Sequence, residues 1–371
     1  MRSIAALFCA APLVVALVPS TDLAQRTASA APVRVCAGGD VTLGTNLDLD
    51  WARAGADTLW RLYSLRPDPD SLAPALRPFF AGADVALINL EGAIGEGPAP
   101  QKCDRHSTSC FAFRQPPNTA EALRRAIDSS TIIVANVANN HSRDAGDAGR
   151  VATVMALQAA GIYVTGADTL PVVVPLPSGD TIAVLGFHTD TAAPDARDLA
   201  AVRRRVRRAA RQYGTVIVTM HLGAEGPNAQ RTRNANEHFL NMNRGNPVAF
   251  ANAALAGGAT LVVGHGPHVL RAAEWRGDRL VLYSLGNLLT YGPFKLRPPT
   301  DRATVACATI DAPRHVGAAE LRSTMQRWPG VLLADSTNRA WRLVDSLSRL
   351  DFPRSGARVS RIGELEKRKR P

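Results

Sequence analysis

Short apolar segments alternate with helical patterns along most of this 371-residue chain, and this alternation constrains the fold more than any other feature. We expect helices at Thr119–Ile127, Gly146–Ala160, Arg197–Tyr213 and Pro247–Leu255. We expect strands at Val33–Ala37, Val85–Asn89, Ile132–Ala135, Ile162–Thr165, Ile182–Leu185, Val216–Met220, Leu261–Val263, Leu280–Tyr283 and Val305–Ile310. Such alternation is typical of α/β proteins, which place functional residues on the loops after strand ends.

Carboxylates follow the first two predicted strands. Asp40 comes after Val33–Ala37 and two glycines, which allow the backbone to turn sharply. Glu91 follows Val85–Asn89. Each residue alone is also compatible with a turn or a helix cap, but a polar group that ends a buried strand favours a site.

Asn139, Asn140 and His141 follow the third predicted strand. An asparagine carbonyl oxygen can bind a metal ion, and a neighbouring histidine outside the coordination shell can protonate a leaving oxygen. The alternative is a capping asparagine with a surface histidine ahead of the next helix.

Three further histidines end predicted strands. His221 follows Val216–Met220, and His265 and His268 follow Leu261–Val263. The glycines on either side of His265 permit an unusual backbone, so both imidazoles of that pair can face one point. A single histidine in such a place is often a satisfied core residue. The whole set instead predicts a site for a divalent ion such as Zn, Mn or Fe, because carboxylate, amide and imidazole are suitable ligands.

The N-terminus predicts export. Arg2 precedes an apolar stretch over Ile4–Val18, and Ala28-Ser29-Ala30 fits the small-residue rule for signal-peptide cleavage. We therefore expect residues 1–30 to be a signal peptide and the mature chain to reach the periplasm, cell envelope or exterior. A membrane anchor is the alternative, but about 15 apolar residues are too few to span about 30 Å of hydrocarbon.

Export permits disulfide bonds. Cys103 and Cys110 flank a short polar loop, and a bond between them would contribute about 2–3 kcal/mol on the loop-closure model. Cys36 and Cys307 each lie in a predicted strand. We expect these two to be buried thiols and not partners.

Arginines supply much of the net charge of +11. In Arg197–Tyr213 they lie opposite an apolar helical stripe, which predicts a solvated helix face; attraction to a polyanion is the alternative. Without interleaved aromatic residues, neither this run nor the Lys367–Arg370 tail predicts nucleic-acid binding. A polar segment, Gln230–Asn246, looks inserted. After Asp311 the pattern weakens, and we expect residues 312–371 to be a loosely packed extension with one helix, Trp341–Leu350, and a basic tail.

Six ordered segments resemble the capsule synthesis protein CapA family, which is linked to poly-gamma-glutamate capsules. They are Ala37–Gly44, Asn89–Glu91, Ala138–Ser142 with Asp144 and Gly146, His221–Glu225, Gly264–Val269 and Tyr283–Asn287. CapA-like domains are in turn similar to calcineurin-like metallophosphoesterases. The resemblance therefore implies a four-layer α/β fold over residues 31–311, with two facing mixed β-sheets flanked by helices and a metal centre at the sheet edges.

The resemblance also implies roles for individual residues. Asp40, Glu91, Asn140, His221, His265 and His268 match metal ligands, and His141 matches the histidine that assists the leaving group. Glu225 would orient an imidazole or act as a base, or else be a surface carboxylate. Asn89, Asn139 and Asn287 would shape the pocket.

Two positions depart from the phosphoesterase pattern. Thr42 stands where phosphoesterases carry a histidine, and the last histidine pair is spaced by three residues instead of two. We therefore expect one firm metal site formed by Glu91, Asn140, His221 and His265, and a weaker second site near Asp40 and His268.

Three functions follow from these expectations. The first is a metal-dependent hydrolase or transferase that uses a metal-activated water to make, attach or release an anionic envelope polymer. The second is a non-catalytic polymer-binding or assembly partner of a membrane polymer synthase. The third is a general metallophosphoesterase, which Thr42 disfavours.

Overall fold

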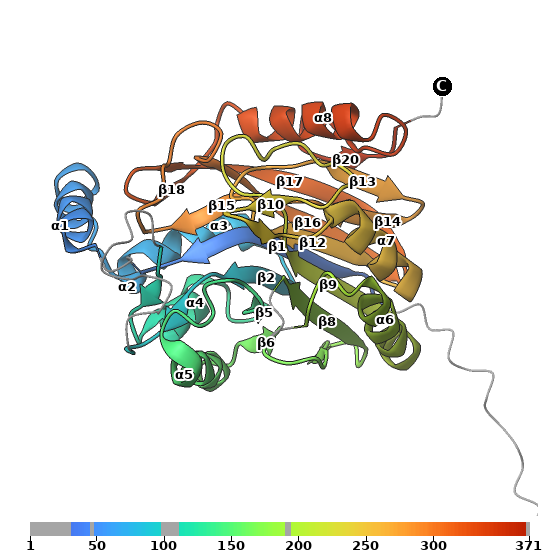
Figure 1. Ribbon diagram of the computed structural model, residues 1–371, viewed down its shortest axis with the longest axis horizontal. Coiled ribbons are helices and arrows are strands. Elements are labelled where there is room, and N and C mark those ends of the chain that lie inside the picture. The colour runs from blue at the N-terminus through green and yellow to red at the C-terminus, as the bar shows by residue number, and fades with distance from the viewer. Residues whose placement is uncertain (1–30, 45–47, 98–110, 190–193, 369–371) are drawn as a thin grey trace, which may run out of the picture.

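The computed structural model describes residues 31–44, 48–97, 111–189 and 194–368 (Figure 1). The predicted signal peptide and the predicted Cys103–Cys110 bond lie outside these residues. Within them, none of the helices combines the length and the apolar character that crossing a bilayer requires.

The larger of the two main sheets has eight strands. Its order is β18 (Val331–Ala334), β17 (His315–Arg327), β16 (Arg302–Ala312), β1 (Val33–Thr42), β2 (Val85–Leu90), β5 (Ile132–Asn136) and β6 (Tyr163–Thr165), with β15 (Asn287–Thr290) also paired to β1. β1, β2, β5 and β6 run parallel, whereas β16 to β18 are antiparallel. The parallel strands therefore all present their carboxyl ends at one edge.

The smaller sheet has six strands. Its order is β13 (Ala273–Arg276), β14 (Arg279–Leu282), β12 (Leu261–His265), β9 (Thr215–His221), β8 (Thr181–His188) and β7 (Val172–Pro175). The four central strands are parallel and the two edge strands antiparallel. Three two-stranded ribbons complete the β-structure: β3 (Ala93–Ile94) with β4 (Arg114–Gln115), β10 (His238–Phe239) with β11 (Met242–Asn243), and β19 (Arg358–Val359) with β20 (Leu365–Glu366).

Most of the helices cover the outer faces of the two sheets, whereas α8 (Arg339–Asp351) contributes side chains to the core between them. The other helices are α1 (Leu49–Thr58), α2 (Pro69–Leu72), α3 (Arg77–Phe80), α4 (Thr119–Ala126), α5 (Gly146–Ala159), α6 (Leu199–Tyr213) and α7 (Pro247–Gly257), with a π turn at Leu59–Tyr63 and a 3-10 turn at Ala73–Leu76. In Figure 1, α4 and α5 lie on one side of the molecule and α6 and α7 on the other.

Three apolar cores separate four layers. Val35, Leu87 and Val263 belong to the core between the two sheets. Ile88 packs with the helices outside the larger sheet, and Val218 with α6 and α7 outside the smaller one. Strands buried on both faces need near-continuous apolar sequences, which is why these segments were recognisable. The predicted α/β architecture of two facing mixed sheets flanked by helices is confirmed.

β1 does not end where the sequence suggested. The expected turn after Ala37 is absent, and β1 continues to Thr42 through a register shift against β2 between Ala37 and Asp40. A Cβ atom at Gly39 would lie 2.0 Å from the backbone oxygen of Gly286, so glycine permits this close approach of two chain segments. Asp40 therefore lies inside the sheet and not on a loop. The strand pairing fixes its position more firmly than a loop would.

The expectation of a loosely packed C-terminal extension is wrong. β17 pairs with β16 along most of its length, and Val316 and Leu321 of β17 enter the core between the sheets. The predicted helix Trp341–Leu350 is confirmed as α8, which adds Val344 to the same core. β17 escaped recognition because charged residues interrupt its apolar side chains, so that no continuous apolar run marks it.

The expectation of free thiols at Cys36 and Cys307 is also wrong. These residues lie directly opposite each other in the antiparallel β1–β16 pair and form a disulfide bond with an S–S distance of 2.09 Å. The two cysteines are 271 residues apart in the sequence. Register between strands so distant in the chain is not encoded locally, so the pairing could not be predicted.

Candidate metal centre

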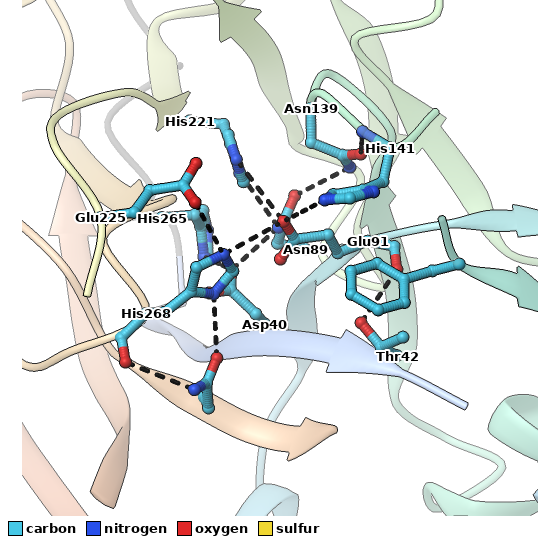
Figure 2. A network of polar contacts seen from close by, with 12 residues as sticks. Asp40, Thr42, Asn89, Glu91, Asn139, His141, His221, Glu225, His265 and His268 are labelled. Carbon is cyan, nitrogen blue, oxygen red and sulfur yellow. Dashed lines mark hydrogen bonds and ion pairs between the residues drawn. The ribbon is translucent and has the colours of Figure 1, made fainter. Parts of the chain in front are cut away.

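Five of the six predicted ligands meet where the carboxyl ends of the two sheets face each other, and the sixth, Asn140, precedes His141 in the loop after β5. Asp40 lies in β1 and Glu91 directly follows β2, both in the larger sheet. His221 and His265 end the adjacent strands β9 and β12 of the smaller sheet and are paired in register. Figure 2 shows these side chains, together with His141 and His268, pointing toward one another.

The imidazoles lie close to two carboxylates. His268 Nδ1 is 3.1 Å from Asp40 Oδ2, and His268 Nε2 is 3.5 Å from Glu91 Oε1. His265 Nδ1 is 3.6 Å from Asp40 Oδ1, and His221 Nε2 is 3.7 Å from Glu91 Oε1. Asp40, Glu91 and His268 each offer one ligand atom within 4.8 Å of the others. The cluster is therefore continuous, and the predicted division into a firm and a weaker site stays a prediction.

Several buried oxygen and nitrogen atoms of this cluster form no hydrogen bond, although Asp40 Oδ2 has an ion-pair contact with His268 Nδ1. They are Asp40 Oδ2, Glu91 Oε1 and Oε2, His221 Nε2, and both ring nitrogens of His265. Buried polar groups are normally paired, because an unpaired one loses its hydration without compensation. Unpaired buried atoms also occur elsewhere in the described chain, but here six fall in four adjoining residues. Carboxylate oxygens and imidazole nitrogens directed at one point fit a divalent cation.

Asparagines hold the centre from the side of the larger sheet. Asn89 Nδ2 donates to Asp40 Oδ1 at 2.9 Å and lies 3.3 Å from His221 Nδ1. Asn139 Nδ2 donates to the backbone oxygen of Leu90 at 2.8 Å. Asn136, which the sequence analysis missed, donates to Asn89 Oδ1 at 2.9 Å. These amides fix the carboxylate of Asp40 relative to the His221 ring.

Backbone geometry brings His268 into the cluster. His268 has a φ of 57° and Gly266 a φ of 105°, so the unusual backbone expected around His265 is present. A Cβ atom at Gly266 would lie 3.2 Å from His221 Nε2. Asn287 Oδ1 is 3.0 Å from His268 Nδ1, and Asn287 Nδ2 donates to the His268 backbone oxygen. Asn287 therefore orients the His268 ring, and its role in shaping a pocket stays a prediction.

His141 forms a dyad with Asp144. Their Nδ1 and Oδ2 atoms are 2.6 Å apart, and His141 Nε2 is 3.9 Å from Glu91 Oε1. The Phe113 ring lies 4.3 Å from the His141 ring, centroid to centroid, and its backbone N–H donates to Asp144. Asn140 stands beside His141 with its carboxamide oxygen buried. Asp144 was noticed only as part of a motif, and nothing in the sequence pointed to Phe113.

Glu225 faces the centre and is not a surface carboxylate. Its side chain is 13% exposed, and its Oε2 is 3.8 Å from His268 Nε2. Arg244 Nη2 lies 2.8 Å from Glu225 Oε1, and the Arg244 side chain is 2% exposed. Arg244 comes from the polar segment Gln230–Asn246, whose composition gave no sign that one arginine would be buried beside the site.

Thr42 occupies the position at which the resembled phosphoesterases have histidine. Its hydroxyl donates to the backbone oxygen of Glu91 at 2.9 Å. The residue therefore ties β1 to the segment that carries Glu91 and offers no imidazole there.

Burial and mutual contacts shift the pKa values of the cluster. Burial would raise the pKa of Asp40, but the His265 and His268 rings beside it hold that pKa well below its usual range. Burial raises the pKa of Glu91, and burial with the nearby Arg244 charge lowers the pKa of His221. Burial opposes protonation of His268, yet Glu91 and Asp40 raise its pKa to about 10. Opposed shifts in one cluster are typical of functional sites.

A buried centre of carboxylates and imidazoles between two facing sheets defines an α/β protein with a candidate metal site. The family described as bacterial capsule synthesis protein PGA_cap matches residues 34–291, and the chain belongs to that family. The expected family membership is confirmed. The chain is 24% identical over 308 residues to the capsule biosynthesis protein CapA of Bacillus anthracis. This match covers 75% of this chain and 66% of that relative. The match thus spans just under two thirds of the relative.

Solved structures with similar folds share little sequence with this chain. A phosphatase of Mycoplasma pneumoniae has a TM-score of 0.44 at 12% identity, covering 79% of this chain and 94% of that one. The protein TT1561 of Thermus thermophilus has a TM-score of 0.36 at 10% identity, covering 74% and 93%.

Proposed function

We propose that this protein is an exported, metal-dependent hydrolase or transferase that acts on an anionic polymer of the bacterial envelope during capsule synthesis. The observation that carries the proposal is the buried cluster of Asp40, Glu91, His221 and His265. Six carboxylate oxygens and imidazole nitrogens of these residues form no hydrogen bond. Such an arrangement is costly in an empty core and is compensated when a cation binds. The name of the Bacillus anthracis relative supports the assignment to capsule synthesis.

Asp40, Glu91, His221, His265 and His268 would hold the ion, and a role for Asn140 as a further ligand stays a prediction. A divalent ion in this cage would supply Lewis-acid polarisation and would lower the pKa of a water molecule. Thr42 offers no imidazole, so this ligand set lacks the histidine that phosphoesterases carry at that position.

His141 is placed to move a proton. The 2.6 Å contact between His141 Nδ1 and the Asp144 carboxylate fixes the ring, and its Nε2 faces the cluster beside Glu91. An imidazole fixed in this way can donate a proton to a leaving group from Nε2, since the carboxylate stabilises the protonated ring. Phe113 packs against the same ring and limits its access to water.

Glu225 and His268 form the more open side of the centre, and the buried Arg244 lies behind Glu225. Glu225 and His268 are 13% and 12% exposed, whereas Glu91 and His221 are fully buried. A divalent cation held next to this side would favour approach by an anionic group. A polymer that carries carboxylates or phosphates suits this side of the site.

Elemental analysis tests the metal. Purified full-length protein, equilibrated with Zn, Mn and Fe in turn, should retain about one divalent ion per chain, and His221→Ala should lose it. His315→Ala is the matched control, because His315 pairs with Asp311 outside the cluster. Retention of no metal by the wild-type protein would refute the proposal.

Catalysis is tested separately. His141→Ala should keep its metal but reduce capsule formation when it is expressed in a deletion strain. The reason is that loss of a general acid lowers the rate of the catalysed step by about 10²–10⁴-fold. His238→Ala, at an exposed position in β10, is the control. Full capsule formation by a His141→Ala strain would instead favour a binding or assembly role next to a membrane polymer synthase.

A further inference from the structure

Helix α6 carries six arginines and no acidic residue. Three of them, Arg204, Arg205 and Arg208, line a cavity of about 460 Å³ on the outer side of the smaller sheet. The remaining lining residues are Thr169, Leu170, Pro171, Leu185, Ala201, Ala209, Gln212 and Tyr213, none of them acidic. We call this cavity the arginine groove. It shares no residue with the candidate metal centre.

The positive charge of the groove is not balanced within the chain. Among the residues that the structure describes, no ion pair or hydrogen bond engages the side chain of Arg204, Arg205 or Arg208. Arg205 Nη1 is buried and has no hydrogen-bond partner. Asp168, beside the groove in sequence, accepts a hydrogen bond from the Leu170 backbone N–H. A buried guanidinium N–H without an acceptor is unfavourable, and an anionic ligand would satisfy it.

Helix α4 differs from α6 in that an arginine on its surface is paired with acidic residues. In α4, Arg125 is paired with Glu121 one turn before it and with Asp70. In α6, Arg204 and Arg208 are also one turn apart, but they repel each other, because like charges four residues apart destabilise a helix. An ordinary solvated helix face does not require this arrangement, and bound anions would relieve it.

We propose that the arginine groove binds an extended anionic chain through its carboxylate or phosphate groups. The planar fork of arginine matches either group with two parallel hydrogen bonds. Arg204 and Arg208 are offset by about 6 Å along the helix axis, which suits successive charges of a polymer. Leu170, Pro171 and Leu185 add apolar surface for its uncharged part.

The topology connects the groove with the edge of the sheet that carries the metal centre. β8 ends at His188, which is in register with His221, and α6 begins shortly after this edge and runs back along the sheet. A polymer bound along α6 would therefore extend toward the centre. Binding in the groove does not require the centre to be occupied, so this proposal goes beyond the proposed function.

Polymer binding measured by fluorescence anisotropy tests the groove. The probes are labelled poly-L-glutamate and labelled polyphosphate, at low and physiological salt, with labelled neutral dextran as the negative probe. The groove variant is Arg204→Gln/Arg205→Gln/Arg208→Gln. The control variant is Arg203→Gln/Arg207→Gln/Arg211→Gln, which removes the same charge from the same helix outside the groove. We expect the groove variant to bind at least about tenfold more weakly and the control to change by less than about threefold.

Two further measurements keep the test specific. Arg205→Lys keeps the charge but removes the fork, so it should weaken binding while leaving the melting temperature unchanged. EDTA should leave the difference of about tenfold in affinity between the wild-type protein and the groove variant unchanged, which separates this proposal from the metal centre; loss of that difference in EDTA would overturn the proposal. Binding to one probe alone identifies carboxylate or phosphate as the recognised group. Equal weakening in both triple variants, wild-type affinity in Arg205→Lys, or no binding of either polyanion by the wild-type protein would overturn the proposal.

Discussion

Glu91 and Asp335 are both buried carboxylates that directly follow a strand, yet they meet opposite surroundings. Asp335 follows β18 and accepts hydrogen bonds from Ser323 Oγ, from Thr337 N and Oγ1, and from Ala340 N, by which it joins β17 to the start of α8. Glu91 follows β2, and neither oxygen of its carboxylate has a hydrogen-bond partner. The chain itself satisfies the hydrogen-bonding capacity of the Asp335 carboxylate, whereas the Glu91 carboxylate requires a bound ligand.

This contrast separates structural from functional polar residues. A carboxylate that serves the fold satisfies its oxygens within the chain, because each unpaired buried oxygen lowers the free energy of unfolding. A carboxylate that binds a ligand keeps its oxygens unpaired within the chain, and this lowers the stability of the protein without the ligand. Changes in the structural region should therefore alter stability and not metal binding, and changes in the centre should do the reverse.

The largest expected effect concerns the Cys36–Cys307 bond. The double variant Cys36→Ser/Cys307→Ser should lose about 4–5 kcal/mol in free energy of unfolding, because the bond closes a very long loop. Denaturant unfolding measures the loss, and elemental analysis should show unchanged metal content under native conditions. Loss of metal from the folded variant would mean that the bond also positions Asp40, which lies in the same strand as Cys36.

Metal addition should have the next largest effect. At about a thousand times its dissociation constant, a divalent ion that binds only the folded state raises the free energy of unfolding by about 4 kcal/mol. We expect this gain in the wild-type protein and in Asp335→Ala, and none in His221→Ala. Calorimetry with and without EDTA measures it. An equal gain in His221→Ala would place the ion elsewhere.

Removal of the Asp335 carboxylate should cost somewhat less. Asp335→Ala loses four hydrogen bonds, and at about 1 kcal/mol each, partly recovered by water, we expect a loss of about 3 kcal/mol. Asp198→Ala is the control. Among the described residues, the Asp198 carboxylate accepts one hydrogen bond, the capping bond from Ala201 N, so this substitution should cost about 1 kcal/mol. If both substitutions cost the same in urea unfolding, the Asp335 network is not the stabilising feature that its contacts indicate.

The smallest effect distinguishes two glycines with positive φ. Gly266 and Gly277 have φ values of 105° and 66°, so alanine at either should cost about 1–2 kcal/mol through backbone strain. A Cβ atom would lie 3.2 Å from His221 at Gly266 but would meet nothing within 4 Å at Gly277. Gly266→Ala alone should therefore weaken metal binding in a titration. Equal metal affinities in both variants would contradict the tight fit around His221.

Much of the fold could be predicted because its central strands are buried on both faces. β2, β9 and β12 are short, continuous apolar runs, and each was recognised within one or two residues of its observed ends. The same logic located the ligands, since polar residues at the ends of such runs have few structural reasons to be there. Asp40, Glu91 and His268 were found in this way and do converge.

What escaped prediction depends on contacts between distant segments. The Cys36–Cys307 bond needs the β1–β16 register, and β17 is buried only because β16 lies beside it. Arg244 is buried because the segment that contains it folds back over the centre, where Glu225 lies. No local pattern records such encounters.

The antiparallel strands beyond the family match have a practical consequence. The match ends at residue 291, but β16, which begins at Arg302, pairs with β1 and covers the flank of the strand that carries Asp40. A recombinant fragment trimmed to the matched segment would leave the backbone amides and carbonyls of β1 bare on that flank, a template for intermolecular strand addition. Such a fragment should aggregate when expressed, so biochemical work needs the chain through α8.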